Sequence, residues 1–129
     1  MLAPPFTGRC LCGAVTYRCS APPLWQAFCH CESCRRATAS PVTAFLGMAD
    51  GAWAWTGAPP STFQSSPGTW RAFCPTCGTP MAYRSDRIPG ERHFYAATLD
   101  DPSAFTPTQH DFIAEKLPWL HLSDGLPGI

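Results

Sequence analysis

The sequence has no excess of charge of either sign. Its 129 residues include nine Lys and Arg against nine Asp and Glu, so the formal net charge is zero. Binding to nucleic acid draws on an excess of positive charge that attracts the phosphate backbone. We therefore do not expect nucleic acid as a partner of this protein.

Long apolar runs are absent as well. No stretch approaches the roughly 20 apolar residues that span a bilayer. The segment MLAPPFTGRC has neither the basic start nor the apolar centre of a secretory signal. We expect no membrane association and a cytoplasmic location. Clustered cysteines in a reducing cytosol are more often metal ligands or redox groups than disulfides.

Long helices are also excluded, because 15 prolines and 10 glycines interrupt the chain. The short alternating runs between these residues are typical of strands, and they predict a mainly β fold in one domain. The expected strands cover residues 13–19, 24–29, 41–47, 52–57, 61–66, 69–74, 80–85 and 92–99. A helical turn is predicted at 32–38 and a short helix near Pro102. The tail is expected to be irregular, with Leu117, Trp119 and Leu122 as its anchors.

The eight cysteines carry most of the information about chemistry. Two pairs are each followed by glycine, Cys10 with Cys12 in CLCG and Cys74 with Cys77 in CPTCG. In zinc knuckles such a glycine lets the backbone turn tightly while N–H groups point at the thiolate sulfurs. Together the two pairs supply four ligands, which predicts a closed structural zinc site. Cys19 has no close partner and is expected to be a core thiol.

Three further cysteines, Cys29, Cys31 and Cys34, lie within six residues of one another. Three thiolates bind one face of a zinc ion and leave the fourth position open, where zinc performs chemistry. A different partition, in which the first glycine-flanked pair joins two members of this group, satisfies the valence equally well. A site closed by a fourth protein ligand is a further alternative. The candidates for the fourth ligand are water, His30, His93, His110 and His121.

Two zinc ions with seven thiolates sum to a charge of 4 − 7, or −3, so neighbouring cations are expected. In one interpretation the arginines beside the cysteines only compensate this charge. In the other, Arg35 or Arg36 holds the carboxylate of an anionic substrate. Lys116 is a further candidate for that role, and Trp25 or Trp119 for a wall of the pocket. The arginines that flank proposed ligands are Arg9, Arg35, Arg36 and Arg71.

A family resemblance follows from the segments GRCLCGAVTY, FCHCESCRRA, FCPTCGTPMAYR, AATLDDP and KLPWLHLSDGLP. In order and spacing they resemble the glutathione-dependent formaldehyde-activating enzyme family, which includes the centromere protein V group. The resemblance covers 7–127, the core of a single domain over 1–129. It implies small stacked antiparallel sheets in a tent-like fold, with one or two short helical turns. It also implies two zinc ions, a structural one on Cys10, Cys12, Cys74 and Cys77 and a catalytic one on Cys29, Cys31 and Cys34.

The activity implied by the resemblance is the condensation of formaldehyde with glutathione to S-hydroxymethylglutathione, which is classed with carbon-sulfur lyases. The expected protein is thus a zinc-dependent, lyase-like enzyme whose partner is a small thiol such as glutathione. A non-catalytic, zinc-stabilised module that binds a protein or a small molecule is the alternative. The sequence leaves open the true substrate, the oligomeric state and the occupancy of the second zinc site.

One residue departs from the family pattern. The family often has a glycine where this chain has Ala39, in the segment CRRATAS. An alanine beside the second zinc site alters the approach to the pocket, so the sequence specifies the substrate less well than the fold.

Overall fold

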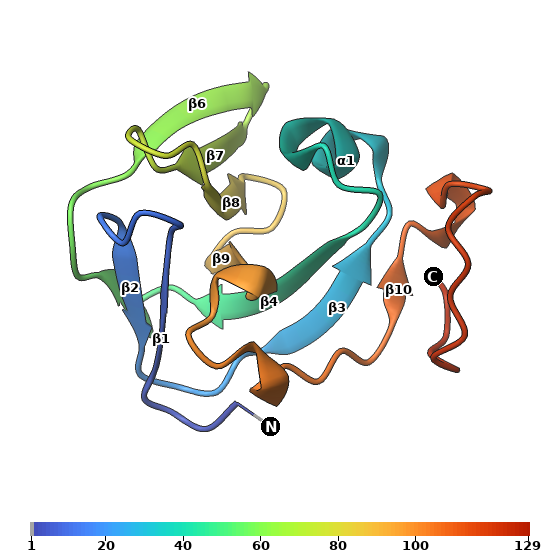
Figure 1. Ribbon diagram of the computed structural model, residues 1–129, viewed down its shortest axis with the longest axis horizontal. Helices are drawn as coiled ribbons and strands as arrows, with labels where there is room; N and C mark the ends of the chain where they lie inside the picture. The colour runs from blue at the N-terminus through green and yellow to red at the C-terminus, as the bar shows by residue number, and fades with distance from the viewer. Residues whose placement is uncertain (1) are drawn as a thin grey trace.

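The protein is built from short strands that form two sheets (Figure 1). A computed structural model describes residues 2–129. Its strands are β1 (Phe6–Arg9), β2 (Thr16–Cys19), β3 (Trp25–Cys29), β4 (Thr43–Ala49), β5 (Trp53–Trp55), β6 (Ser61–Ser66), β7 (Thr69–Phe73), β8 (Pro80–Ser85), β9 (Glu91–Tyr95) and β10 (His110–Asp111). Within these residues the smaller sheet has the order β1-β2-β5 and the larger β10-β3-β4-β9-β8-β7-β6. The predicted mainly β fold is confirmed.

The helices are short and lie in the connections between strands. They are the α-helix α1 (Glu32–Thr38) and the 3-10 helices η1 (Ala96–Thr98), η2 (Pro102–Ala104) and η3 (Ile113–Glu115). The helical turn predicted at 32–38 is thus α1, and the short helix predicted near Pro102 is the single 3-10 turn η2. Within residues 2–129, no helix is long and apolar enough to cross a bilayer.

Side chains of both sheets share one hydrophobic core. Tyr17 of β2 stacks on Phe94 of β9 with ring centroids 4.3 Å apart, and Trp55 of β5 contacts Phe94 at 5.6 Å. Aromatic pairs at these separations add to the free energy gained by burying their area. Cys19 is fully buried in this core, as predicted, and its burial raises the pKa of its thiol to about 12.

The opposite face of the larger sheet carries a row of large side chains. Successive strand residues point to opposite faces, so Phe94 faces the core while its neighbour His93 faces away from it. Across the sheet, His93 is in register with Gly47 of β4 and Tyr83 of β8, and Tyr83 is in register with Arg71 of β7. The strand pairing therefore aligns polar and aromatic groups from several strands on one surface.

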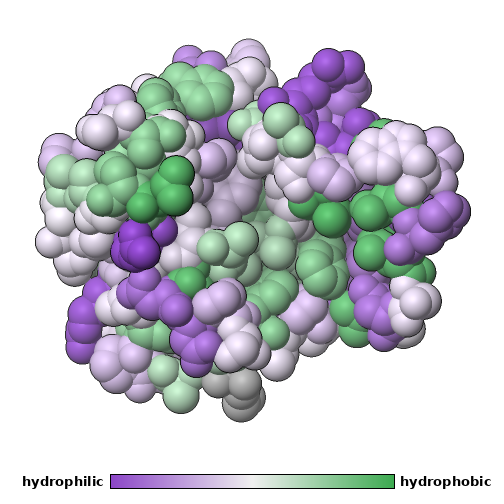
Figure 2. Space-filling model, in the orientation of Figure 1, coloured by the Kyte–Doolittle hydropathy of each residue, from purple (hydrophilic) through white to green (hydrophobic). Residues whose placement is uncertain are grey.

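The C-terminal segment follows β10, which pairs in parallel with β3 at the edge of the larger sheet. The backbone N–H of Ile129 donates to the carbonyl of His110, so the chain end returns to this strand. Figure 2 shows apolar side chains at the surface beside this segment. The prediction that Trp119 and Leu122 anchor the tail is wrong, because their exposed fractions are 64% and 43%.

Candidate metal centres

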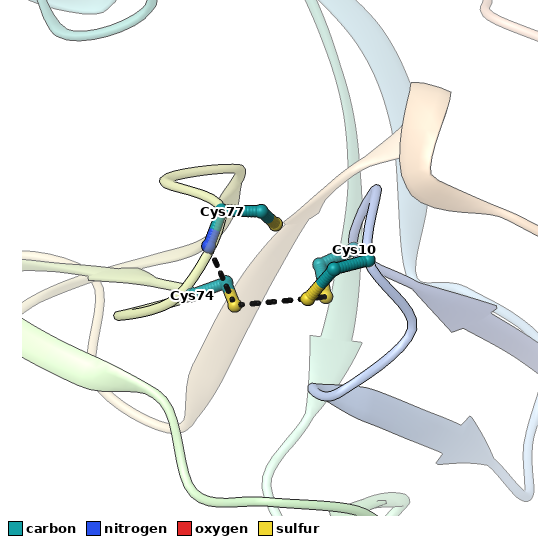
Figure 3. Close-up of side chains that lie close together, drawn as sticks. Cys10, Cys74 and Cys77 are labelled. Carbon is teal, nitrogen blue, oxygen red and sulfur yellow. Dashed lines mark hydrogen bonds between the residues drawn. The ribbon is translucent and has the colours of Figure 1, made fainter.

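The first cysteine cluster joins two turns that are distant in the chain. Cys10 and Cys12 lie in the turn between β1 and β2, and Cys74 and Cys77 in the turn between β7 and β8. Figure 3 shows the sulfur atoms of the two turns converging. All four lie within 4.8 Å of one another, with 3.6 Å between Cys10 and Cys12 and 3.7 Å between Cys12 and Cys74. Four sulfurs about 2.3 Å from a central zinc are about 3.8 Å apart, so the cluster has the size of a tetrahedral zinc site.

The backbone of both turns supports thiolate sulfur. Gly13 and Gly78 follow the second cysteine of each pair and have φ angles of 82° and 79°, in the left-handed region that glycine adopts without strain. The Val15 N–H donates to Cys10 Sγ at 3.3 Å, and the Cys77 N–H to Cys74 Sγ at 3.4 Å. These N–H bonds are the feature expected of the glycine-flanked pairs, and they favour the charged form of the thiol.

The side chain of Thr79 supports a further sulfur of this cluster. A hydrogen bond with the Thr79 hydroxyl, 3.1 Å from Cys77 Sγ, is the main cause that lowers the pKa of the Cys77 thiol to about 5. Cys10 and Cys74 are buried, with exposed fractions of 1% and 0%. Cys12 is exposed and Cys77 is half-buried, so what suits this cluster to a closed metal site is its full set of four donors and not its burial.

The second cluster is built on one short segment. Cys29 ends β3, Cys31 is the N-cap residue of α1, and Cys34 lies in the first turn of that helix. Their sulfurs lie within 4.8 Å of one another, with 3.8 Å between Cys29 and Cys34. Among the residues that the structure describes, no fourth His, Cys, Asp or Glu lies within this range of all three. The donor set thus fits one triangular face of a tetrahedral site.

Hydrogen bonds among the three thiols concentrate negative charge on Cys31. Those from Cys29 and then Cys34 are the largest causes that lower the pKa of the Cys31 thiol. The backbone N–H of Cys34, 3.3 Å from Cys31 Sγ, acts in the same direction. The bonds with Cys31 and Cys34 raise the pKa of Cys29 in turn. Of the three thiols, Cys31 is therefore the one whose charged form its neighbours favour most.

A buried arginine contacts this second cluster. The Arg71 Nη1 and Nη2 atoms lie 3.8 and 3.7 Å from Cys34 Sγ, and Nη1 also donates to the Tyr95 hydroxyl at 2.9 Å. In the sequence Arg71 precedes Cys74 by three residues, which in one interpretation makes it a counter-charge beside the first cluster. Three residues of strand cover about 10 Å, and the side chain of Arg71 reaches the other cluster across the sheet.

A large cavity opens beside the second cluster. Its volume is about 1140 Å³, and it is lined by Cys29, Cys31 and Cys34. Trp25, Tyr83 and other members of the aligned row on the larger sheet form part of its wall. The cavity is large enough to hold a small organic molecule. The three thiols therefore border a space of substrate size, with Cys31 half-buried and Cys29 and Cys34 buried.

The predicted substrate contacts are distributed unevenly around this cavity. Arg36 lines it and forms an exposed ion pair with Glu32 of the same helix, 3.0 Å between Nε and Oε2. The residues lining the cavity do not include Arg35, Lys116 or Trp119. The Nζ atom of Lys116 donates to backbone carbonyls of the tail, including that of Leu117 at 3.1 Å. Trp25, the other predicted wall residue, does line the cavity.

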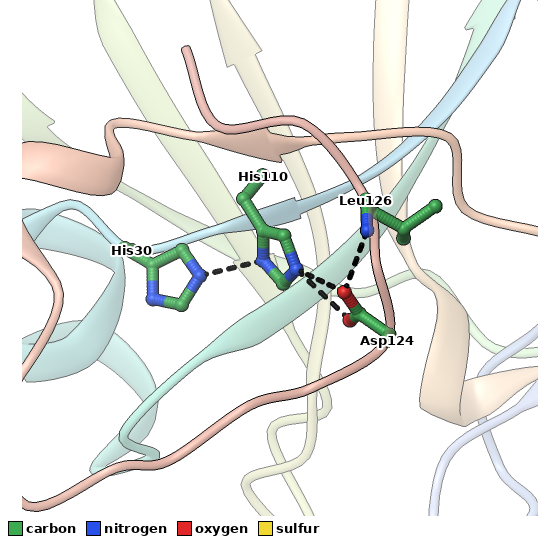
Figure 4. A network of polar contacts seen from close by, with 4 residues as sticks. All are labelled: His30, His110, Asp124 and Leu126. Carbon is green, nitrogen blue, oxygen red and sulfur yellow. Dashed lines mark hydrogen bonds and ion pairs between the residues drawn. The ribbon is translucent and has the colours of Figure 1, made fainter.

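The histidines have partners other than the thiols. His30 is fully buried, and its Nε2 lies 2.8 Å from Nδ1 of His110, whose Nε2 lies 2.9 Å from an Asp124 oxygen (Figure 4). Because the carboxylate accepts from Nε2–H, Nδ1 of His110 accepts from His30. This chain ties the tail to the segment that carries Cys29 and Cys31. His93 lies in the cavity wall with its Nε2 3.2 Å from Glu91.

Sequence reasoning did not identify the roles of Tyr95, Glu91 and Asp124. Tyr95 holds Arg71, Glu91 accepts hydrogen bonds from His93 and from the Trp25 indole, and Asp124 holds His110. None of these residues lies near a cysteine in the sequence. Glu91 and Tyr95 are placed by the cross-strand register of β9 and Asp124 by the path of the tail, and neither can be read from the sequence.

The fold is mainly β, and its two cysteine clusters, one of four donors and one of three beside a cavity, are able to hold two metal ions. The model of the family described as glutathione-dependent formaldehyde-activating enzyme matches residues 5–115. The chain therefore belongs to that family.

Comparison with solved structures gives a match to the fold. A crystal structure of a Rhodobacter sphaeroides protein superposes with a TM-score of 0.62 at 22% identity, covering 74% of this chain and 88% of that one. At this identity the likeness supports the fold alone. A search of curated proteins finds no match.

Proposed function

We propose that the protein is a zinc-dependent enzyme, folded as one domain over 1–129, that joins glutathione to formaldehyde and yields S-hydroxymethylglutathione. The S–H bond of the thiol breaks, a C–S bond forms at the carbonyl carbon, and the carbonyl oxygen gains the proton. The reverse reaction cleaves a C–S bond, as a carbon-sulfur lyase does. The family to which the chain belongs supports this choice of thiol and aldehyde.

The observation that carries the proposal is a triad of thiols with three donors beside a cavity. Cys29, Cys31 and Cys34 line a cavity, and in residues 2–129 no fourth side-chain ligand completes the group. Sulfur donors suit zinc, and an incomplete shell is typical of a catalytic site. A zinc ion held there would supply a Lewis acid that makes the proton of a thiol more acidic. The closed cluster of Cys10, Cys12, Cys74 and Cys77 would hold a structural zinc.

The other residues of the cavity provide binding and orientation. Its aromatic wall, with Trp25 and Tyr83, removes water from the neighbourhood of the reacting thiol. Arg36 is the predicted substrate contact that the geometry favours. Its ion pair with Glu32 is exposed, with side-chain exposures of 79% and 55%, and such pairs are weak. Arg36 is therefore free to exchange Glu32 for a carboxylate of glutathione.

The proposal is tested by mixing the zinc-loaded protein with glutathione and formaldehyde and following exchange of the adduct by NMR. We expect exchange faster than in buffer, and we expect Cys31→Ser to abolish the acceleration. Cys19→Ala is the matched control, because Cys19 lies in neither cluster and its removal should leave the acceleration in place. A protein with two zinc ions per chain that does not accelerate exchange would refute the enzymatic function.

The binding-module alternative makes an opposite prediction about the second metal. A site with an open position loses its ion to a chelator faster than a closed four-sulfur site. We expect about one zinc per chain to be removed early by a chelator and the other only on unfolding. Equal and slow release of both ions would favour two structural metals and a non-catalytic module.

A further inference from the structure

The second cluster differs from ordinary thiol groups in having a permanent cation in contact with a sulfur. Arg71 is 4% exposed, and both of its terminal nitrogens face Cys34 Sγ at 3.7 and 3.8 Å. A guanidinium does not lose its proton in a protein. The positive charge next to Cys34 is therefore a fixed property of the site.

The position of the arginine is held by several contacts. Nη1 donates to the Tyr95 hydroxyl at 2.9 Å, and the guanidinium carbon lies 5.0 Å from the centre of the Tyr83 ring. Nε is buried without a hydrogen-bond partner within residues 2–129. A buried charge with an unpartnered donor is costly, so a purely structural arginine would be better satisfied at the surface. When the triad holds a dication, Cys34 is a thiolate, and its sulfur is the counter-charge that offsets this cost.

The charge sum of the site changes when Arg71 is included. A dication with three thiolates has a net charge of 2 − 3, or −1, which opposes the approach of another anion. Adding Arg71 brings the sum to 0. In the first cluster a dication with four thiolates sums to −2, and its neighbour Arg9 donates to the carbonyls of Cys10 and Leu11 rather than to sulfur.

We propose that Arg71 is a specificity-determining residue, which makes the open position of the Cys29, Cys31 and Cys34 site accept an anionic sulfur ligand, a thiolate, in preference to a neutral one. This inference rests on the proposed function, because it assumes a dication at the triad. It adds the charge state of the ligand that the site selects. Arg71 acts on the incoming ligand through space and is not itself a ligand of the metal.

The expected size of the effect follows from distance. The open fourth position of a tetrahedral zinc site lies about 3.8 Å from Cys34 Sγ. Because Arg71 Nη2 lies 3.7 Å from the same sulfur, the open position is at most about 7.5 Å from that nitrogen. At that separation and an effective dielectric constant of about 20, one unit charge changes the affinity of an anion about 10- to 50-fold. The affinity of a neutral ligand should change by less than about threefold.

The test uses the full chain with Co²⁺ at its metal sites, because sulfur-to-cobalt absorption bands report ligand binding without turnover. Two probes are titrated at one pH: 2-mercaptoethanol, which binds as a thiolate, and imidazole, which binds as a neutral molecule. We expect Arg71→Met to lose about 10-fold or more in thiol affinity while imidazole affinity is retained. Arg71→Lys, which keeps the charge, should preserve most of the preference for the thiol.

Arg71→Gln serves as a second neutral variant, because it retains a donor for Tyr95 should Arg71→Met fail to fold. Equal weakening of both probes, or no change in either, would overturn the role of Arg71 and leave a structural arginine. A wild-type protein that holds Co²⁺ at the triad but binds neither probe would instead remove the open position, and with it the proposed function. The two failures are thus distinguishable.

Discussion

The two cysteine clusters use the same donor atom but are assembled in different ways. The first draws its thiols from two turns far apart in the chain, whereas the second takes all three from the end of β3 and the start of α1. A metal on the first cluster closes a long loop, so its binding is coupled to folding. A metal on the second cross-links a segment that strand and helix already shape. The two candidate sites therefore differ in how far apart their donors lie in the sequence.

The clusters also differ in what surrounds them. The first has four donors and is supported by backbone N–H groups, and the second has three donors, faces a cavity and contacts Arg71. Both buried histidines whose pKa is lowered, His30 and His93, lie on the side of the second cluster. The surroundings of the second cluster thus combine a cavity, a buried arginine and two buried histidines.

The largest effect is expected from breaking one cluster at a time. Cys77→Ser removes a ligand of the closed site, and because its metal is coupled to folding we predict loss of a cooperative unfolding transition. Cys31→Ser removes a ligand of the open site, and we predict a folded protein with one zinc per chain. Metal counting and thermal unfolding followed by circular dichroism measure both results. If both variants lose stability equally, metal binding at the two clusters is coupled to folding to the same extent, and the proposed difference between them is wrong.

An intermediate effect is expected from acid. Burial lowers the pKa of His93 below its usual value near 6.5, so the folded state binds fewer protons than the unfolded state. The free energy of unfolding should therefore fall as pH drops through about 6.5, and level off below the folded pKa. His93→Gln should reduce this fall, measured by urea unfolding between about pH 5 and pH 7.5.

The matched control for that experiment is His121→Gln, because His121 is exposed. We expect it to leave the pH dependence unchanged. An identical profile for the His93→Gln protein and the wild type would mean that the acid sensitivity does not come from the cavity wall beside the second cluster.

The smallest effect concerns the backbone that carries each cluster. In the first cluster, Gly13 and Gly78 have left-handed backbone. Beside the second cluster, the residue with left-handed backbone is Ala39, at the end of α1, with φ 57°. An alanine pays a steric cost there that glycine does not, so Ala39→Gly should raise the free energy of unfolding by about 0.5–1 kcal/mol. Urea unfolding measures the change.

Ala37→Gly is the control for that substitution. Ala37 has ordinary helical backbone inside α1, and glycine there should lower the free energy of unfolding by up to about 1 kcal/mol. If both substitutions destabilise the protein, the left-handed conformation of Ala39 is not a source of strain.

Much of the strand pattern was predictable, because alternation and the positions of Gly and Pro are local signals. The run at 61–66 coincides with β6 and that at 80–85 with β8. The tail was less predictable. Its tryptophan and leucine are apolar enough to suggest anchoring, but the segment is held by the hydrogen bond between the buried His110 and the partly exposed Asp124. A polar anchor leaves no periodic apolar pattern to detect.

By itself the sequence determined that eight cysteines divide into two glycine-flanked pairs, a crowded group of three and one lone residue, because spacing and turn glycines are local properties of the chain. Only the tertiary structure decided that Arg71 lies against Cys34, 37 positions away, and that no histidine in residues 2–129 joins the three thiols. These facts depend on which strands pair and in what register, and that is set by the packing of the whole core.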